Sequence, residues 1–181
     1  ARYWSGRCHL YLENYIRAVS IFNSLLLSNP DNDNARFYRA QAYLLAEDYP
    51  HAVEDLGILN KLYPTDIDIH ERLAHCQFLM KDYESAATSY GKIIDRDVEN
   101  HEAWYKRGLC KYQLGRFEQA VDDFEVLGDR YPEDANIQYY LGLCYLGLED
   151  WVAARSLLQN AIEIDENHHR AHLAIGDADV K

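Results

Sequence analysis

Hydrophobic residues recur along this chain at the three- and four-residue spacing of amphipathic helices, in pairs of short segments. In the stretch 101–134, one such pattern spans residues 102–114 and a second spans residues 117–130. Gly115 lies between them, where glycine can close a helix, and Pro132 ends the second segment. The pattern therefore predicts an antiparallel pair of helices joined by a tight turn.

The same pattern repeats with a period of 34 residues along the whole chain, without an insertion or a deletion. Equivalent positions form columns of one kind of side chain. A small column holds Gly6, Ala40, Ala74, Gly108, Gly142 and Gly176, and an aromatic column holds Tyr15, Tyr49, Tyr83, Phe117 and Trp151. Each helix pair alone would leave an apolar face uncovered, so neighbouring pairs must stack to bury it. The sequence predicts an all-α solenoid of stacked antiparallel hairpins.

These columns resemble the tetratricopeptide repeat (TPR), and the resemblance covers the whole chain. It is strongest in residues 101–134, where the motif positions hold Trp104, Gly108, Ala120, Phe124 and Pro132. It implies a right-handed superhelix formed by a single array over 1–181, with units 1–32, 33–66, 67–100, 101–134, 135–168 and a half unit 169–181. The chain begins and ends inside first helices of the repeat, so we expect it to be a fragment of a larger protein.

The cysteines all fall in one column of the repeat. They are Cys8, Cys76, Cys110 and Cys144, and the other members of the column are Ala42 and Ala178. Equivalent residues of stacked hairpins are too far apart for a disulfide or for a shared zinc ion. The column therefore predicts a small buried position and free thiols.

No catalytic, cofactor or metal motif stands out. The chain has no Gly-rich phosphate loop, no GxSxG and no HExxH, so we expect no enzymatic activity, no cofactor and no metal site. His168, His169 and His172 form a histidine cluster that we interpret as a solvated helix start.

Other polar and aromatic residues also have structural interpretations. We assign the pair Asp122 and Asp123 to a solvated acidic face, and the three tryptophans Trp4, Trp104 and Trp151 to helix packing. Two departures from the family pattern stand out, because Arg39 and Arg107 occupy a first-helix position where the family favours Leu.

Charge narrows the classes of partner. The chain has 18 Lys and Arg against 30 Asp and Glu, a net charge of −12, which disfavours nucleic acid. It has no apolar run of membrane-spanning length, so membrane insertion is not expected. Basic residues outnumber acidic ones in the first-helix segments, whereas the second helices and loops carry the acidic excess. Free thiols favour an intracellular location, whether cytoplasmic, cytoskeletal or ciliary, and leave the bacterial periplasm open.

The resemblance implies that the first helix of each hairpin lines a concave groove. The groove candidates are aromatic and basic: Tyr3, Trp4, Arg7, Phe37, Tyr38, Gln41, Glu71, Arg72, His75, Tyr105, Lys106, Leu109, Tyr139 and Tyr140. Tyr together with Arg is the composition of binding hot spots. The motif itself favours Tyr in one of these columns, so packing between helices is an open alternative for the same side chains.

The resemblance thus implies a non-enzymatic scaffold for protein–protein interaction within a larger assembly. Its groove would bind a peptide or helix with apolar anchors and some acidic residues. The alternative is the recruiting arm of an enzyme whose catalytic domain lies outside this segment. A chaperone-adaptor grip on a C-terminal carboxylate is disfavoured, because Asp68 stands beside Arg72 and would repel that group. Self-association through exposed solenoid ends stays open.

Overall fold

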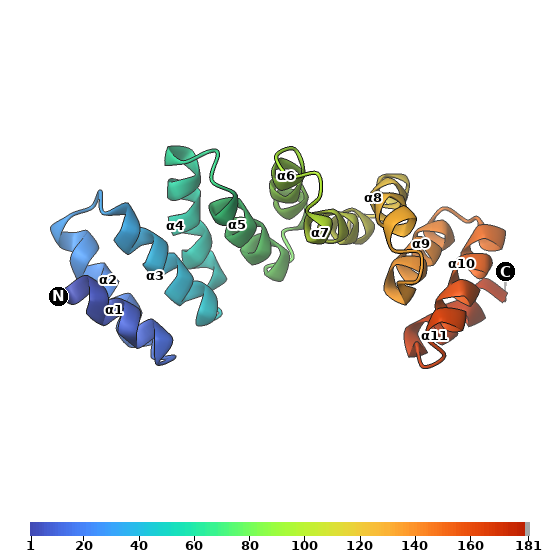
Figure 1. The fold of residues 1–181 in the computed structure, drawn as a ribbon, viewed down its shortest axis with the longest axis horizontal. Helices are drawn as coiled ribbons and strands as arrows, with labels where there is room; N and C mark the ends of the chain where they lie inside the picture. The colour runs from blue at the N-terminus through green and yellow to red at the C-terminus, as the bar shows by residue number, and fades with distance from the viewer. Residues whose placement is uncertain (180–181) are drawn as a thin grey trace. The chain divides into compact units, whose positions relative to one another are not determined.

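The structure, a computed structural model, describes the backbone of residues 1–179 and side chains as far as residue 176. This part of the chain is all helical and has no strand, which confirms the predicted fold class (Figure 1). The helices are α1 (Arg2–Tyr11), α2 (Tyr15–Ser28), α3 (Asp33–Leu45), α4 (Tyr49–Leu62), α5 (Ile67–Leu79), α6 (Tyr83–Ile94), α7 (His101–Gln113), α8 (Phe117–Arg130), α9 (Ala135–Gly147), α10 (Trp151–Ile164) and α11 (His169–Asp179). The end of the predicted half unit, 180–181, lies outside the described residues. Within the described residues, no helix combines the length and the apolar character that a membrane crossing requires.

The chain divides into two compact units, residues 1–89 and 90–181. Within each unit, α1 packs on α2, α3 on α4, α7 on α8 and α9 on α10, as the hairpin pattern predicts. Successive hairpins also touch, because α3 packs on α2, α5 on α4, α9 on α8 and α11 on α10. Helices α7 and α8 agree with the predicted segments 102–114 and 117–130 to within one residue at every end. The single array over 1–181 stays a prediction.

The turn inside each hairpin has one residue with left-handed backbone. These residues stand 34 apart, and their φ values lie between 57° and 71°: Glu13, Glu47, Lys81, Gly115 and Glu149. In the first hairpin, the backbone N–H of Glu13 donates to the carbonyl of Leu10, and that of Asn14 donates to the carbonyl of His9. These two bonds satisfy carbonyls that the end of a helix leaves unpaired. The prediction that Gly115 closes its helix is confirmed, but the other hairpins make the same turn without glycine.

The links between hairpins have two repeated hydrogen bonds. The first is an N-cap: Asn32, Asp66, Asn100, Asp134 and His168 each accept the backbone N–H of the third residue that follows. The second comes from a side-chain donor four residues after the cap, which binds the carbonyl six residues before itself. These donors are Arg36 to Pro30, His70 to Pro64, Trp104 to Val98 and His172 to Glu166. Chemically different side chains at one repeat position thus give the same bond, so this position depends on a hydrogen-bond donor and not on one residue type.

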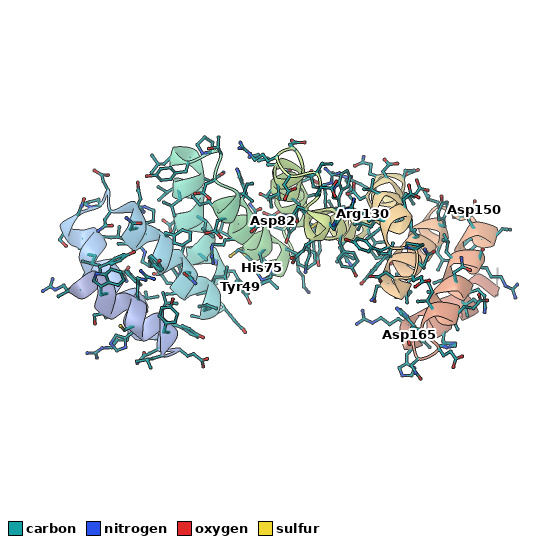
Figure 2. All side chains as sticks on the ribbon, in the orientation of Figure 1. Tyr49, His75, Asp82, Arg130, Asp150 and Asp165 are labelled. Carbon is teal, nitrogen blue, oxygen red and sulfur yellow. The ribbon has the colours of Figure 1, made fainter. Side chains whose placement is uncertain are left out.

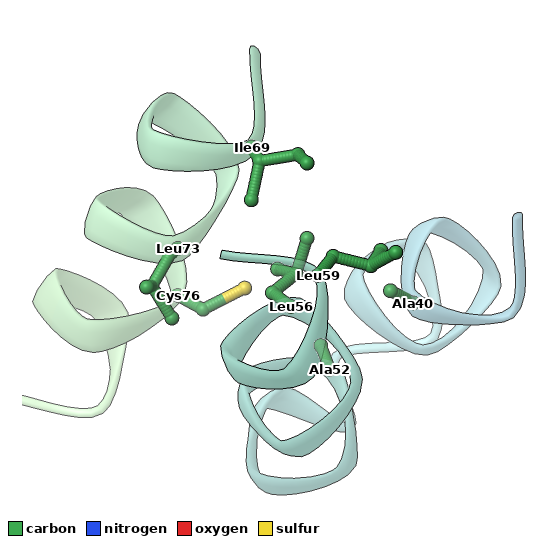
Figure 3. Close-up of a cluster of buried hydrophobic side chains, with 7 residues drawn as sticks. All are labelled: Ala40, Ala52, Leu56, Leu59, Ile69, Leu73 and Cys76. Carbon is green, nitrogen blue, oxygen red and sulfur yellow. The ribbon is translucent and has the colours of Figure 1, made fainter. Parts of the chain in front are cut away.

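Small residues on the first helices face large residues on the second. A Cβ atom added to Gly108 would lie 2.9 Å from Cζ of Phe124, and one added to Gly6 would lie 2.7 Å from Cζ of Phe22. A core in the second hairpin and α5 is drawn in Figure 3: Ala40, Ala52, Leu56, Leu59, Ile69, Leu73 and Cys76. Complete burial of a side chain such as Leu56 stabilises the fold by roughly 1.5–3 kcal/mol relative to leaving it exposed.

Two second-helix aspartates are buried as ion pairs. Arg39 places Nη2 2.5 Å from the carboxylate of Asp55, and Arg107 places Nη2 2.7 Å from that of Asp123. Asp123 forms a second ion pair with Lys111, whose Nζ atom lies 2.9 Å from Oδ2 of the carboxylate. The assignment of Asp123 to a solvated face is therefore wrong: its side chain is about as buried as that of Asp55, whereas Asp122 is exposed as predicted. The departure of Arg39 and Arg107 from the family pattern is what makes these aspartates tolerable in the core.

The cysteine column differs between its first member and the others. The structure confirms that all four thiols are free, and Cys76, Cys110 and Cys144 are buried as predicted. Cys8 is exposed, so the prediction is wrong there. Cys76 packs with residues of α4, the second helix of the preceding hairpin (Figure 3), and Cys144 packs with residues of α8 in the same way, whereas α1 is the first helix that the structure describes. The side chain of Ala178, the last member, lies outside the described residues.

Candidate functional site

A cavity of about 400 Å³ lies on the first helices of the unit 1–89. Three first helices form it: α1 supplies Arg7, Leu10 and Tyr11, α3 supplies Phe37, Tyr38, Gln41 and Leu45, and α5 supplies Asp68 and Arg72. We call it the α1–α3–α5 cavity. Five of the groove residues predicted from the sequence line it, namely Arg7, Phe37, Tyr38, Gln41 and Arg72. Its size and its mixture of apolar and polar groups are those of ligand sites.

The Arg7 guanidinium is held between aromatic rings at one wall of this cavity. Its Cζ atom lies 4.8 Å from the ring centroid of Trp4 and 4.8 Å from that of Tyr38. Its polar neighbours are the hydroxyls of Tyr3 and Tyr11. Aromatic faces attract a guanidinium and fix its plane, but they carry no net charge. The site therefore keeps a positioned cation.

The Arg72 guanidinium, which α5 supplies to the cavity, has a different environment. It lies 5.0 Å from the ring centroid of Phe37, and Nη2 is 3.2 Å from the Asp68 carboxylate one helical turn away. This pair joins two partly exposed side chains, so it stabilises the helix only slightly. Its effect on the cavity is larger, because Asp68 neutralises Arg72 and places a negative charge beside any ligand.

The tyrosines of the groove columns also pack between hairpins. Tyr38 stacks on Phe22 at a centroid distance of 6.0 Å, and Tyr3 meets Tyr38 edge-on at 5.6 Å. Three repeats later, Tyr140 stacks on Phe124 at 5.6 Å, and Tyr105 meets Tyr140 edge-on at 5.8 Å. Burial and then the neighbouring Tyr140 raise the pKa of Tyr105, which keeps its hydroxyl neutral. These rings serve inter-helix packing, and Tyr38 also lines the cavity.

The remaining candidates lie in several environments. In the unit 90–181, Tyr105, Leu109 and Tyr140 pack on the buried core of α8 and α9, and Tyr139 packs on that of α10 and α11. Lys106 is half-buried on α7. Glu71 and His75 are exposed on α5, where Figure 2 labels His75.

Trp4, which the sequence analysis assigns to helix packing, is exposed in the structure. It is 62% exposed, so its assignment to helix packing is wrong, and its ring contacts the ring of Tyr3 and the guanidinium of Arg7. Trp104 and Trp151, the other two tryptophans, are half-buried.

Four cavity residues are missing from the predicted set: Leu10, Tyr11, Leu45 and Asp68. Leu10 and Tyr11 follow Arg7 by about one helical turn, and Leu45 follows Gln41 by four residues. Residues at this spacing share a helix face. The helical spacing therefore indicates Leu10, Tyr11 and Leu45 as well, but the predicted groove positions end at Arg7 and Gln41, one turn before the end of each helix.

The histidine cluster does not act as one group. His168 is 9% exposed, lies 4.9 Å from the Tyr139 ring and accepts the N–H of Ala171 through Nδ1 at 3.1 Å. The interpretation as a solvated helix start is thus wrong for His168, which is the N-cap of α11. His169 and His172 are exposed as that interpretation requires, and His172 bonds the carbonyl of Glu166. Among the described residues, no three His, Cys, Asp or Glu side chains converge as metal ligands.

Comparisons with known proteins agree with the repeat architecture. Residues 18–93 match the family described as anaphase-promoting complex, cyclosome, subunit 3. Residues 80–128 and 111–169 match a family described as tetratricopeptide repeat. A comparison with curated proteins gave no match.

Solved structures with similar folds include one that is described as a repeat protein. YrrB, described as a TPR protein with an unusual peptide-binding site, has a TM-score of 0.83 at 19% identity, covering 93% of this chain and 87% of that chain. A structure described as MamA AMB-1 has a TM-score of 0.81 at 18% identity, covering 92% and 91%. MamA from Desulfovibrio magneticus RS-1 has a TM-score of 0.75 at 21% identity, covering 83% and 85%. At these identities the likeness concerns the fold. The 34-residue columns, the stacked hairpins and the matched families together establish that this chain is a tetratricopeptide repeat protein.

Proposed function

We propose that the chain is a protein-interaction scaffold that binds a peptide or helix of a partner on the surface of its first helices. The observation that carries the proposal is the α1–α3–α5 cavity, because three successive hairpins each contribute side chains to it. A surface built from repeated helices suits an extended or helical ligand that contacts each repeat in turn. YrrB, whose fold is similar, is described as having a peptide-binding site, which supports the same class of ligand.

The chemistry of the lining favours an amphipathic ligand. Leu10, Phe37 and Leu45 offer apolar contact, and Arg7, which has no carboxylate partner among the described residues, offers charge-assisted hydrogen bonds. We therefore infer a ligand with apolar anchors and acidic residues. The family matched over residues 18–93 is named after a subunit of a multiprotein complex, which supports a role within a larger assembly.

Site-specific photocrosslinking tests this proposal. A benzophenone amino acid is placed at Gln41, which lines the cavity, and in a matched control at Lys61, which is exposed on α4. We expect the Gln41 variant to crosslink to a defined peptide of a partner protein in extracts of the source cell, identified by mass spectrometry, and the Lys61 variant not to. Equal crosslinking from both positions, or crosslinks from Lys61 alone, would contradict binding on the first helices.

A further inference from the structure

The two guanidiniums of the α1–α3–α5 cavity differ in what neutralises them. Arg72 has Asp68 as its carboxylate partner, with Nη2 3.2 Å from Oδ1. Arg7 has no carboxylate partner among the described residues, and its neighbours are aromatic rings and tyrosine hydroxyls. Of the two cations, Arg7 is therefore the one whose charge awaits a partner.

Arg7 is also fixed in position before any ligand arrives. The Trp4 and Tyr38 rings, each 4.8 Å from Cζ, restrict the guanidinium plane. A cation held in this way loses less conformational entropy when it binds an anion. Its Nε atom, like that of Arg72, is buried without a hydrogen-bond partner among the described residues, which is a cost to the unliganded state.

The balance of charge in the cavity decides what kind of anion fits. The lining has two cations, Arg7 and Arg72, and one anion, Asp68, so its net charge equals that of a single cation. One carboxylate complements this charge. A phosphoryl group carries close to two negative charges at neutral pH, so it would leave one negative charge uncompensated in this lining, beside Asp68.

The cavity also offers an apolar surface next to Arg7. Leu10 follows Arg7 on the same face of α1, and Phe37 and Leu45 belong to the neighbouring α3. An apolar side chain placed there removes its surface from water while an acidic neighbour reaches Arg7. The lining thus favours a ligand with the two kinds of side chain at a fixed spacing.

We propose that the α1–α3–α5 cavity reads one internal Asp or Glu side chain of a bound peptide through Arg7, beside one apolar anchor, and does not select phosphoserine. This inference rests on the proposed function, because it specifies the ligand of the same site. Arg7 is the specificity-determining cation, and Asp68 is the residue that excludes the doubly charged group.

Selection from a random peptide library identifies the probe. A phage-displayed library of 12-residue peptides is panned against the chain, and the enriched peptides are sequenced. We expect them to share an acidic residue at a constant distance from a large apolar residue. The best binder is then synthesised in three forms that differ only at the acidic position: Glu, Gln and phosphoserine.

Binding is measured by fluorescence anisotropy with the three forms and matched protein variants. Replacing Glu by Gln in the peptide should weaken binding roughly 10- to 100-fold, the loss of a charge-assisted hydrogen bond. Arg7→Gln should weaken the Glu peptide by a similar factor and make the Glu and Gln peptides equivalent. Arg17→Gln, at an exposed arginine on α2, is the control and should change nothing. Circular dichroism checks that each variant is folded, and the peptide exchange needs no change in the protein.

Asp68→Asn tests the charge balance separately. It should strengthen binding of the phosphoserine peptide relative to the Glu peptide, because the repelling carboxylate is gone. A phosphoserine peptide that binds the unaltered chain more tightly than the Glu peptide would overturn the proposal.

The outcomes separate this inference from the proposed function. Enriched peptides without an acidic position, or full binding to Arg7→Gln with loss on Phe37→Ala, would overturn the reading of a carboxylate and leave peptide binding in place. If the library yields no peptide that binds in the cavity, the result would contradict both the carboxylate proposal and the proposed peptide-binding function.

Discussion

At the scale of single residues, the buried ion pairs show how one exchange depends on another. The same two repeat positions hold a charged pair in the second and fourth units, namely Arg39 with Asp55 and Arg107 with Asp123. In the third and fifth units they hold uncharged pairs, namely Leu73 with Ser89 and Leu141 with Leu157. The charged residues therefore occur together or not at all in these four repeats. A buried carboxylate is costly without its cation, whereas an apolar pair of similar size is not.

Removing one member of a buried pair should destabilise the chain more than removing both. We expect Asp123→Ala to lower the free energy of unfolding by about 3–5 kcal/mol, because Arg107 loses its buried partner. The double variant Arg107→Leu with Asp123→Leu reproduces the pair of the fifth repeat and should recover most of that loss. Urea denaturation followed by circular dichroism measures both, and a double variant as unstable as the single one would contradict this account.

Close helix contact makes a second residue-scale prediction. Gly108→Leu should destabilise the chain by about 1–3 kcal/mol or more, because a Cβ atom there already overlaps the Phe124 ring. Gly57→Leu is the matched control, since a Cβ atom at that helical position meets nothing within 4 Å. Thermal denaturation compares the two variants. Equal melting temperatures would show that the close contact between Gly108 and Phe124 does not restrict the size of the side chain at position 108.

At the scale of elements, the links between helices are specified by hydrogen bonds more than by residue types. The left-handed turn position holds Glu in three hairpins, Lys in one and Gly in one. In four of the five inter-hairpin links, the side-chain donor is a guanidinium, an imidazole or an indole. The backbone geometry is kept because it satisfies the helix ends, so different side chains can occupy it.

Exchanges to glycine should therefore depend on backbone conformation. Glu47→Gly, at a φ of 60°, should leave stability almost unchanged, because relief of left-handed strain offsets the extra entropy of the unfolded chain. Glu54→Gly, the same exchange in the middle of α4, should cost about 1 kcal/mol. Urea midpoints of the two variants test this, and equal losses would argue against a strained turn.

At the scale of the whole molecule, the place of a residue in the stack decides its environment. Within each unit, the first helix of a later hairpin is covered by the second helix of the hairpin before it, as α3 is by α2 and α9 by α8. Helix α1 has no such neighbour in the structure, so Cys8 and Trp4 are exposed while their repeat equivalents are covered to a greater degree. Identical columns thus give different surfaces.

The thiols report this difference directly. Burial raises the pKa of Cys76 to about 11 and those of Cys110 and Cys144 to about 12, whereas Cys8 is exposed. We expect one thiol to react rapidly with a disulfide reagent at pH 8 in the native chain, and none to do so after Cys8→Ser. All four should react in denaturant, and rapid reaction of more than one native thiol would contradict the burial.

The same shifts give a pH dependence of stability. An unfolded thiol ionises near its ordinary pKa of 9.0, and the folded ones ionise higher. Between the unfolded and the folded pKa values, the folded state therefore binds more protons than the unfolded state. The contribution of the buried thiols to the free energy of unfolding is complete below pH 9 and falls as the pH rises towards 11 and 12. Urea midpoints measured from pH 8 to pH 11 should decrease, and Cys110→Ala should reduce the slope.

Periodicity alone determined the helices, their hairpin pairing and the small positions such as Gly108, because a repeat places the same local physics at each interval. The resemblance to the tetratricopeptide repeat, laid on this periodicity, also selected five residues that line the α1–α3–α5 cavity, because it assigns the ligand surface to one face of the first helices. Only the tertiary structure decided that Asp123 is buried, that His168 is a cap and that Cys8 is exposed. These outcomes depend on a partner distant in sequence, on local hydrogen-bond geometry or on the neighbouring hairpin, and a column of equivalent positions contains none of that information.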